Sequence, residues 1–137
     1  MLSTVSINFI LNSTNHIIIE CEINKIFGKF IIDTGASDSC INLCSAKKFN
    51  LITRKSNEVV SSASDNINET FFSEINLLRI KEIKKKNFNI ILFDMSHINN
   101  ILKDKKTDTV DGILGSDILK EFNAIINYKK KLLTLKF

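Results

Sequence analysis

An apolar run that ends abruptly in a carboxylate, within residues 30–37, constrains this chain more than any other stretch of its sequence. The phenylalanine and two isoleucines at 30–32 predict a buried strand, and Asp33 follows them directly. A carboxylate at the end of a buried strand loses hydration, which the fold must compensate or use. Thr34 can donate a hydrogen bond and Gly35 permits a tight turn, so the stretch predicts either a plain strand and turn or a site built on Asp33.

A second element, at residues 110–119, joins two apolar residues to a glycine and then to the start of an amphipathic run. Together the two elements resemble the motifs of the retropepsin-like aspartic proteases. In that family the first motif is the catalytic loop, and the second packs behind it and opens a short helix. The residues that match are Asp33, Thr34, Gly35 and Ala36 in the first motif and Ile113, Leu114, Gly115, Asp117 and Leu119 in the second.

The resemblance implies a fold and a set of site residues. The fold would be all-β with short helices, a closed retropepsin-like β-barrel with one lobe per chain, active as a symmetric homodimer. The residues implied for catalysis are Asp33, Thr34 and Gly35, and those implied for substrate binding are Ala36, Ser37, Asp38, Ser62, Ala63, Ser64 and Ile113. Residues 61–69 stand where the family folds a flap over the substrate. They contain no glycine, unlike retroviral flap tips, so a plain surface loop is the alternative.

Cleavage of a peptide by aspartates requires two carboxyl groups that share one proton. Two like charges a few ångströms apart cannot both ionise, so one group stays protonated and polarises the scissile carbonyl while the other takes a proton from water. The chain holds one Asp-Thr-Gly sequence, and Asp111 lacks the hydroxyl residue and glycine that follow Asp33. A second chain that supplies its own Asp33 is the simplest solution, and the resemblance implies the same. No metal or organic cofactor is needed.

One departure from retroviral relatives concerns the residues that follow each motif. Those relatives often carry an acid after the motif alanine and an arginine after the later glycine, paired near the dimer contact. Here the two places hold Ser37 and Ser116, so no unpaired buried charge is left behind. This pattern, with Met1 opening directly onto the expected fold, favours a free-standing protein of the cellular or bacterial type.

Composition favours one globular domain over residues 1–137. Hydrophobic residues make up 44% and charged residues 25%, which is ordinary for a globular protein. The net charge of +4 comes largely from lysine clusters at 84–86, 103–106 and 129–131. We interpret these clusters as solvated turns, because the absence of tryptophan and the presence of one tyrosine leave no stacking platform for nucleic acid beside them.

Neither a metal site nor a membrane segment is predicted. The three cysteines, Cys21, Cys40 and Cys44, lack paired metal spacing and predict free buried thiols in a reducing compartment. No apolar stretch approaches the roughly 20 residues that span a membrane, and no basic segment followed by an apolar run opens the chain. We therefore expect a soluble, cytoplasmic protein whose partners are a second copy of the chain and a protein or peptide substrate, and neither nucleic acid nor a membrane.

Three functions compete on the sequence. The leading hypothesis is an aspartic endopeptidase that acts as a homodimer. The second is a catalytically silent retropepsin-fold module that dimerises or binds peptides, and the third is a nucleic-acid-associated domain that uses the lysine clusters. The intact Asp-Thr-Gly at 33–35 argues against the second, because a silent module has no need to keep a costly buried acid.

Hydrophobic periodicity and turn residues predict mostly strands. The predicted strands cover residues 6–11, 16–23, 29–33, 39–41, 52–60, 71–80, 88–93, 113–114, 124–128 and 132–137. Short helices are predicted over 43–49, with Asn42 as the N-cap, over 94–102 and over 117–122. Gly28 is expected to shape the turn before residue 29, and the absence of proline leaves the turns to glycine, asparagine and lysine.

Overall fold

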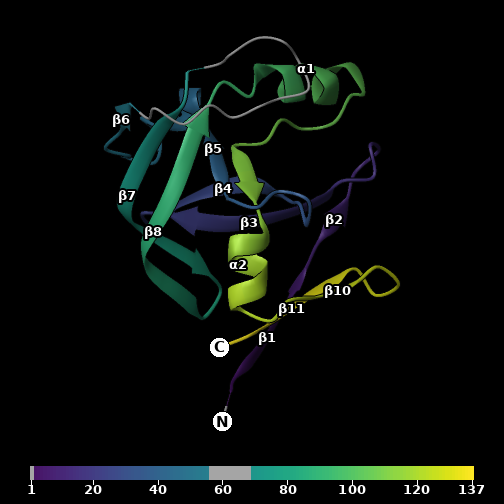
Figure 1. Ribbon diagram of the computed structural model, residues 1–137. Helices are drawn as coiled ribbons and strands as arrows, with labels where there is room; N and C mark the ends of the chain where they lie inside the picture. The colour runs from purple at the N-terminus through teal and green to yellow at the C-terminus, as the bar shows by residue number, and fades with distance from the viewer. Residues whose placement is uncertain (1, 56–68) are drawn as a thin grey trace.

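Six strands close into a β-barrel in the computed structural model, which describes residues 2–55 and 69–137 (Figure 1). The order around the barrel is β3, β4, β9, β5, β8 and β7, and pairing of β3 with β7 completes the ring. These strands are β3 (Ile17–Ile23), β4 (Ile26–Ile32), β9 (Gly112–Leu114), β5 (Cys40–Asn42), β8 (Ile83–Phe93) and β7 (Phe71–Ile80). Two short strands extend the sheet, β2 (Ile10–Leu11) beside β3 and β6 (Arg54–Lys55) beside β7. The predicted closed all-β barrel is confirmed.

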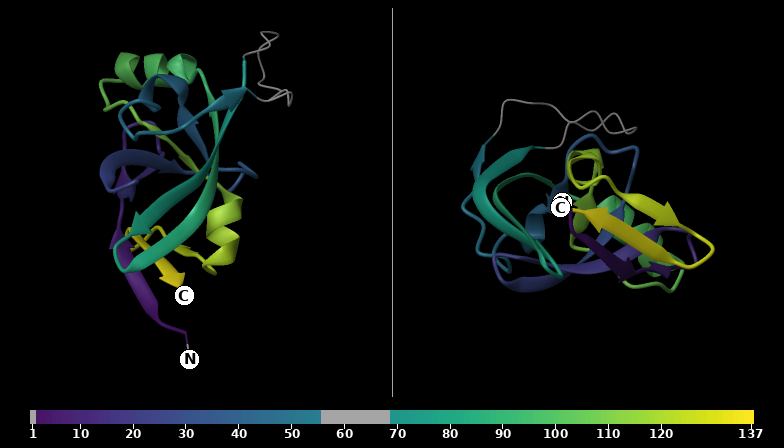
Figure 2. Two further views of the ribbon diagram at one scale, coloured as in Figure 1. Left: turned by 90° about the vertical axis from the view of Figure 1, so that its left-hand side faces the viewer. Right: turned by 90° about the horizontal axis from the view of Figure 1, so that it is seen from below.

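A second sheet and two short helices complete the fold. β11 (Leu132–Lys136) lies between β1 (Thr4–Asn8) and β10 (Ile125–Asn127) and runs antiparallel to both. Helix α1 (Ser96–Asp104) lies at one end of the molecule, and both chain termini lie at the opposite end (Figures 1 and 2). Helix α2 (Ser116–Glu121) follows β9 directly, on the side of the barrel that faces the second sheet (Figure 1).

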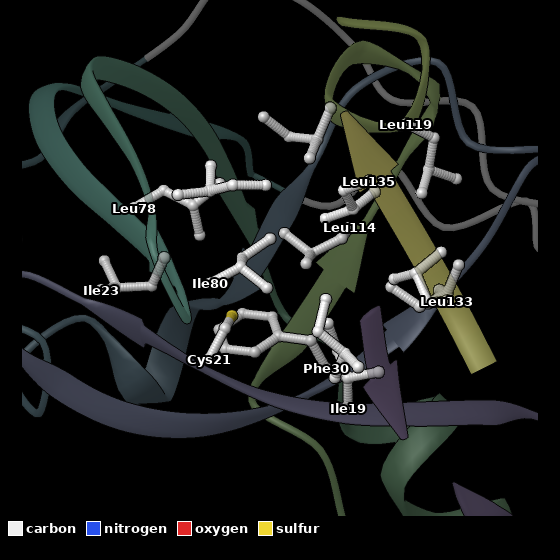
Figure 3. Close-up of a cluster of buried hydrophobic side chains, with 14 of the residues drawn as sticks. Ile19, Cys21, Ile23, Phe30, Leu78, Ile80, Leu114, Leu119, Leu133 and Leu135 are labelled. Carbon is white, nitrogen blue, oxygen red and sulfur yellow. The ribbon is translucent and has the colours of Figure 1, made fainter. Parts of the chain in front are cut away.

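One apolar core joins the barrel to the second sheet (Figure 3). Alternate residues of β3 are buried, as the period of two in its sequence predicts. Leu133 and Leu135 of β11 belong to the same buried cluster as Phe30 of β4, so the second sheet is packed onto the barrel through its central strand. A smaller cluster lies beside α1 and consists of Ile31, Cys40, Met95, Leu102, Val110 and Ile113.

The turn between β3 and β4 corrects the expectation for Gly28. Asn24 and Lys25 form a two-residue turn with φ of 51° and 71°, both left-handed as a type I′ hairpin requires. Gly28 lies inside β4, opposite Cys21. A Cβ at Gly28 would lie 2.6 Å from Phe49 Cζ, so Gly28 is needed for packing and not for a turn. At other turns too, asparagine and lysine take the left-handed positions.

The helix predicted over residues 43–49 is wrong in length. A 3₁₀ turn forms over Leu43–Ser45, and the chain then continues in turns. Asn42 makes no cap hydrogen bond with its side chain, because its Oδ1 accepts the Met95 N–H at 3.1 Å instead. Helices α1 and α2 confirm the other two helix predictions within a few residues. Of the strand predicted over 52–60, β6 is described, and residues 56–60 lie outside the described part of the chain.

The structure tests the prediction that the three cysteines are free, buried thiols. All three thiols are free, and Cys21 and Cys40 are buried as predicted. Cys44 is exposed, because the 3₁₀ turn buries its neighbour Ser45 instead, so the expectation of a third buried thiol is wrong. Within the described ranges, no helix is long and apolar enough to cross a membrane.

Candidate active site

Strand β4 carries Asp33 out of the barrel core. Phe30 and Ile32 belong to the main core and Ile31 to the smaller cluster, so the strand is buried on both faces. This double burial explains why residues 30–32 are all apolar and do not alternate with polar residues. β4 runs parallel to β9, and the Asp33 N–H donates to Leu114 O at 3.0 Å. Asp33 is half-buried at the point where the strand ends.

The Asp33 loop, residues 33–38, folds back on the carboxylate. The Gly35 N–H donates to Asp33 Oδ1 at 2.8 Å, and the Ala36 N–H donates to Asp33 O at 3.2 Å. The expected turn forms at residues 34–35, but Gly35 does not adopt a left-handed backbone, so the turn does not need glycine for its φ angle. A Cβ at Gly35 would instead lie 3.2 Å from Asp33 Oδ1 and would crowd the carboxylate. Thr34 and Gly35 are both exposed.

The start of helix α2 holds this loop from behind. Ser116 Oγ donates to Thr34 O at 2.8 Å, and the Ser116 N–H donates to Ala36 O at 2.7 Å. Gly115 permits this close approach, because a Cβ there would lie 2.5 Å from Ala36 O. The second sequence motif therefore packs behind the first, as the resemblance implied.

Ser39 connects the two motifs, and sequence reasoning did not single it out as a site residue. It is 2% exposed. Its Oγ donates to Asp117 Oδ1 at 2.7 Å and accepts the Gly115 N–H at 3.0 Å, while its own N–H donates to Asp117 Oδ2 at 3.0 Å. The sequence did offer a signal: Ser39 is a hydroxyl residue shortly after the Asp-Thr-Gly, and Asp117 in the second motif is an acid that can accept its hydrogen bond.

Asp111 does not lie with Asp33. Its Oδ2 accepts the Lys29 N–H at 3.0 Å and pairs with Lys48 Nζ at 2.9 Å, and its Oδ1 accepts from Ser45 Oγ at 3.1 Å. Asp111 is level with Lys29 on β4, four residues before Asp33 and therefore about 13 Å away along the strand. Its carboxylate links the loop before β9 to β4 and is not available as a second acid.

The remaining predicted site residues fall into three groups. Ala36 is half-buried and packs against the smaller apolar cluster, which contains Ile113 at 8% exposure. Ser37 and Asp38 are exposed on the Asp33 loop, with Ser37 Oγ donating to Asp38 Oδ2 at 3.3 Å. The residues predicted for the flap side of the site, Ser62, Ala63 and Ser64, lie outside the described residues.

The Cys40 thiol adds no charge to this region. Burial raises the pKa of Cys40 to about 12, and the negative charge of Asp33 adds to that rise. The thiol therefore stays protonated at neutral pH. In the part of the chain that the structure describes, no three histidine, cysteine, aspartate or glutamate side chains gather as they would around a metal ion.

A closed barrel with an Asp-Thr-Gly loop backed by a short helix is the architecture of the retropepsin-like aspartic proteases, and solved structures agree. A retropepsin-like aspartic protease from Rickettsia conorii is 20% identical, with a TM-score of 0.67 over 100% of this chain and 94% of that chain. EIAV protease in complex with the inhibitor HBY-793 is 20% identical, with a TM-score of 0.58 over 80% of this chain and 90% of that chain. The retroviral protease-like domain of Ddi1 from Leishmania major is 18% identical, with a TM-score of 0.59 over 86% of each chain. These likenesses show the fold.

The sequence itself gives the family. Residues 19–118 match the aspartyl protease family, and the chain belongs to it. Among curated proteins, none matches the chain in sequence. The resemblance drawn from the two motifs is therefore confirmed at the level of family and fold.

Proposed function

We propose that this protein is an aspartic endopeptidase that works as a homodimer, with one Asp33 from each subunit. The observation that carries the proposal is the Asp33 carboxylate, which accepts the Gly35 N–H at 2.8 Å at the end of a buried strand, with Thr34 and Gly35 exposed beside it. Because Asp111 is engaged elsewhere, a second copy of the chain is the simplest source of the other carboxylate.

In the proposed dimer the two Asp33 carboxyls share one proton. The ionised carboxylate takes a proton from a water, whose oxygen forms a bond to the scissile carbonyl carbon, and the protonated carboxyl donates to the carbonyl oxygen. When the tetrahedral intermediate collapses, the C–N bond breaks and a carboxyl returns a proton to the leaving nitrogen. The Gly35 N–H would orient one oxygen of Asp33, and Thr34 would contact the partner's loop. No metal or organic cofactor takes part in this scheme.

The substrate would be an extended segment of a protein or peptide that lies along the Asp33 loop. Ala36, with Ile113 in the cluster behind it, would offer apolar surface to the substrate. Ser37 and Asp38 would offer polar groups, because both are exposed on the same loop. An extended backbone alternates its side chains between two sides, so successive substrate residues would meet different parts of this surface.

Replacement of Asp33 by asparagine tests the proposal with little change of shape. The purified protein should cleave an unfolded protein or a peptide library, with products identified by mass spectrometry, and Asp33→Asn should lower the rate by about a thousandfold or more. Asp104→Asn is the matched control, because Asp104 is exposed at the end of α1, and it should leave the rate unchanged. Full activity of Asp33→Asn would overturn the proposal.

Mixed dimers test whether each site takes one Asp33 from each chain. If wild-type and Asp33→Asn chains associate at random in equal amounts, about a quarter of the dimers contain two wild-type chains. Activity should then be about a quarter of that of the same total amount of wild-type protein. A value of about one half would mean that each chain carries a complete site, and analytical ultracentrifugation would establish that the mixed sample is dimeric.

The alternative is a catalytically silent retropepsin-fold module that dimerises or binds peptides. The same experiments distinguish it from the protease. A wild-type dimer that binds peptides in a fluorescence assay but cleaves none of the library would favour the silent module and contradict the proposed activity.

A further inference from the structure

A polar pocket lies beside the end of the Asp33 loop. Its volume is about 410 Å³, and its walls come from the loop, from strands β7 and β8 and from the start of α2. The residues that matter for its chemistry are Asp38, Phe72, Lys85, Asn89, Ile91 and Asp117. Asp33 is not part of the wall, so the pocket neighbours the proposed cleavage site without including it.

Of the charged groups in this wall, Asp38 alone has no committed partner among the described residues. Lys85 Nζ pairs with Glu121 Oε1 at 2.8 Å. Both oxygens of Asp117 accept hydrogen bonds from Ser39. Asp38 is exposed, accepts one long hydrogen bond of 3.3 Å from the neighbouring serine, and has no described cation within ion-pair distance. Asp38 therefore presents a free negative charge at the pocket.

The rest of the wall suits the stem of a long cationic side chain. Phe72 and Ile91 are half-buried and offer apolar surface. Asn89 is exposed and carries an amide oxygen that can accept a hydrogen bond from an ammonium or guanidinium group. Lysine and arginine combine an apolar stem with a charged head, whereas an acidic side chain would be repelled by Asp38.

We propose that this pocket binds a lysine or arginine side chain of the substrate, so that the protein prefers a basic residue on one side of the scissile bond. The inference rests on the proposed function, because it assigns a specificity to that same site. The basic residue would flank the scissile bond, since the pocket includes Asp38 and not the reacting Asp33.

Matched peptides that differ in one side chain test this preference. Peptides with lysine, norleucine or glutamate at each flanking position are offered to the wild-type protein. At the position that reaches the pocket, kcat/KM for lysine should exceed that for norleucine by about three- to tenfold, and the ratio should shrink as salt is raised. Asp38→Asn should bring the ratio close to one, and Asp38→Lys should favour glutamate. Asp104→Asn should keep the wild-type ratio.

The outcomes separate this inference from the proposed function. If the wild-type protein cleaves lysine and norleucine peptides equally at every position, or if Asp38→Asn keeps the wild-type ratio, the inference is overturned and the protease assignment stands. Cleavage by Asp33→Asn at the wild-type rate would overturn the protease assignment instead.

Binding to the Asp33→Asn protein tests the pocket without catalysis. By fluorescence anisotropy, the lysine peptide should bind about three- to tenfold more tightly than the norleucine peptide. Addition of Asp38→Asn to the same protein should remove that difference. Equal affinities for the two peptides at low salt would overturn the inference whether or not the wild-type protein is a peptidase.

Discussion

Ser39 offers the sharpest test of how the two motifs hold each other. Ser39→Ala removes the 2.7 Å hydrogen bond to Asp117 and leaves the Gly115 N–H without its acceptor. A hydrogen bond to a charged group contributes about 1.5–3 kcal/mol, and a buried donor left unsatisfied costs about 1–3 kcal/mol. The Ser39 N–H keeps its bond to Asp117, and water can reach that half-buried carboxylate. We therefore expect the free energy of unfolding to fall by about 2–4 kcal/mol.

Urea unfolding at neutral pH and fixed protein concentration measures this loss, and a thermal melt should show a fall in Tm of about 10 °C. Ser37→Ala is the matched control, because Ser37 is exposed on the same loop and makes one hydrogen bond of 3.3 Å. The control should change the free energy of unfolding by less than about 0.5 kcal/mol. A loss below about 1 kcal/mol for Ser39→Ala would refute the reasoning, because the Gly115 N–H would then be satisfied in another way.

Three further outcomes are expected. Gly28→Ala should lower the free energy of unfolding in urea by about 1–3 kcal/mol, because the new Cβ would lie 2.6 Å from Phe49 Cζ. Cleavage should rise and then fall with pH, since in the proposed dimer the two Asp33 carboxyls share one proton, and chelators should not affect the rate. A rate that climbs steadily above neutral pH would implicate another group. The hydrogen bond from Lys29 lowers the pKa of Asp108, so Asp108 should titrate below the ordinary aspartate range by NMR, and Lys29→Gln should reverse this. Any stabilisation from the Lys29–Asp108 pair is present when the pH is above the pKa that Asp108 has in the unfolded chain. It is lost as the pH falls through the lower pKa that Asp108 has in the folded protein.

The strand that delivers Asp33 could be predicted because its signal is local. Residues 30–32 are continuously apolar, and β4 is buried on both faces between the main core and the cluster beside α1. The alternating pattern of β3 is equally local, since one face lines the core and the other does not. The Asp-Thr-Gly sequence and the glycine of the second motif are also local signals, and the two motifs occur along the chain in the same order as in the family.

The parts that could not be predicted depend on contacts between distant residues. Ser39 and Asp117 are 78 positions apart, and a serine in a polar loop has many other possible partners. Gly28 resembles a turn residue until Phe49 is placed beside it. Residues 43–49 have helical spacing, but Phe49 is fully buried in the main core, and tertiary packing of this kind overrides local helix propensity.

The serines at the two positions where retroviral relatives often carry a charged pair act separately in this chain. Ser116 Oγ donates to Thr34 O and Ser37 Oγ donates to Asp38 Oδ2, and no hydrogen bond joins the two described serines. Because Ser116 holds the Asp33 loop through hydrogen bonds between neutral groups, to Thr34 O and Ala36 O, salt should change the geometry of the loop little. The proposed attraction of a substrate cation to the exposed Asp38, in contrast, would be screened by salt. With the dimer at saturating concentration, added salt should therefore lower the preference for lysine over norleucine and leave kcat for the norleucine peptide nearly constant. If that kcat falls in parallel with the preference, the loop depends on charge in a way that these hydrogen bonds do not explain.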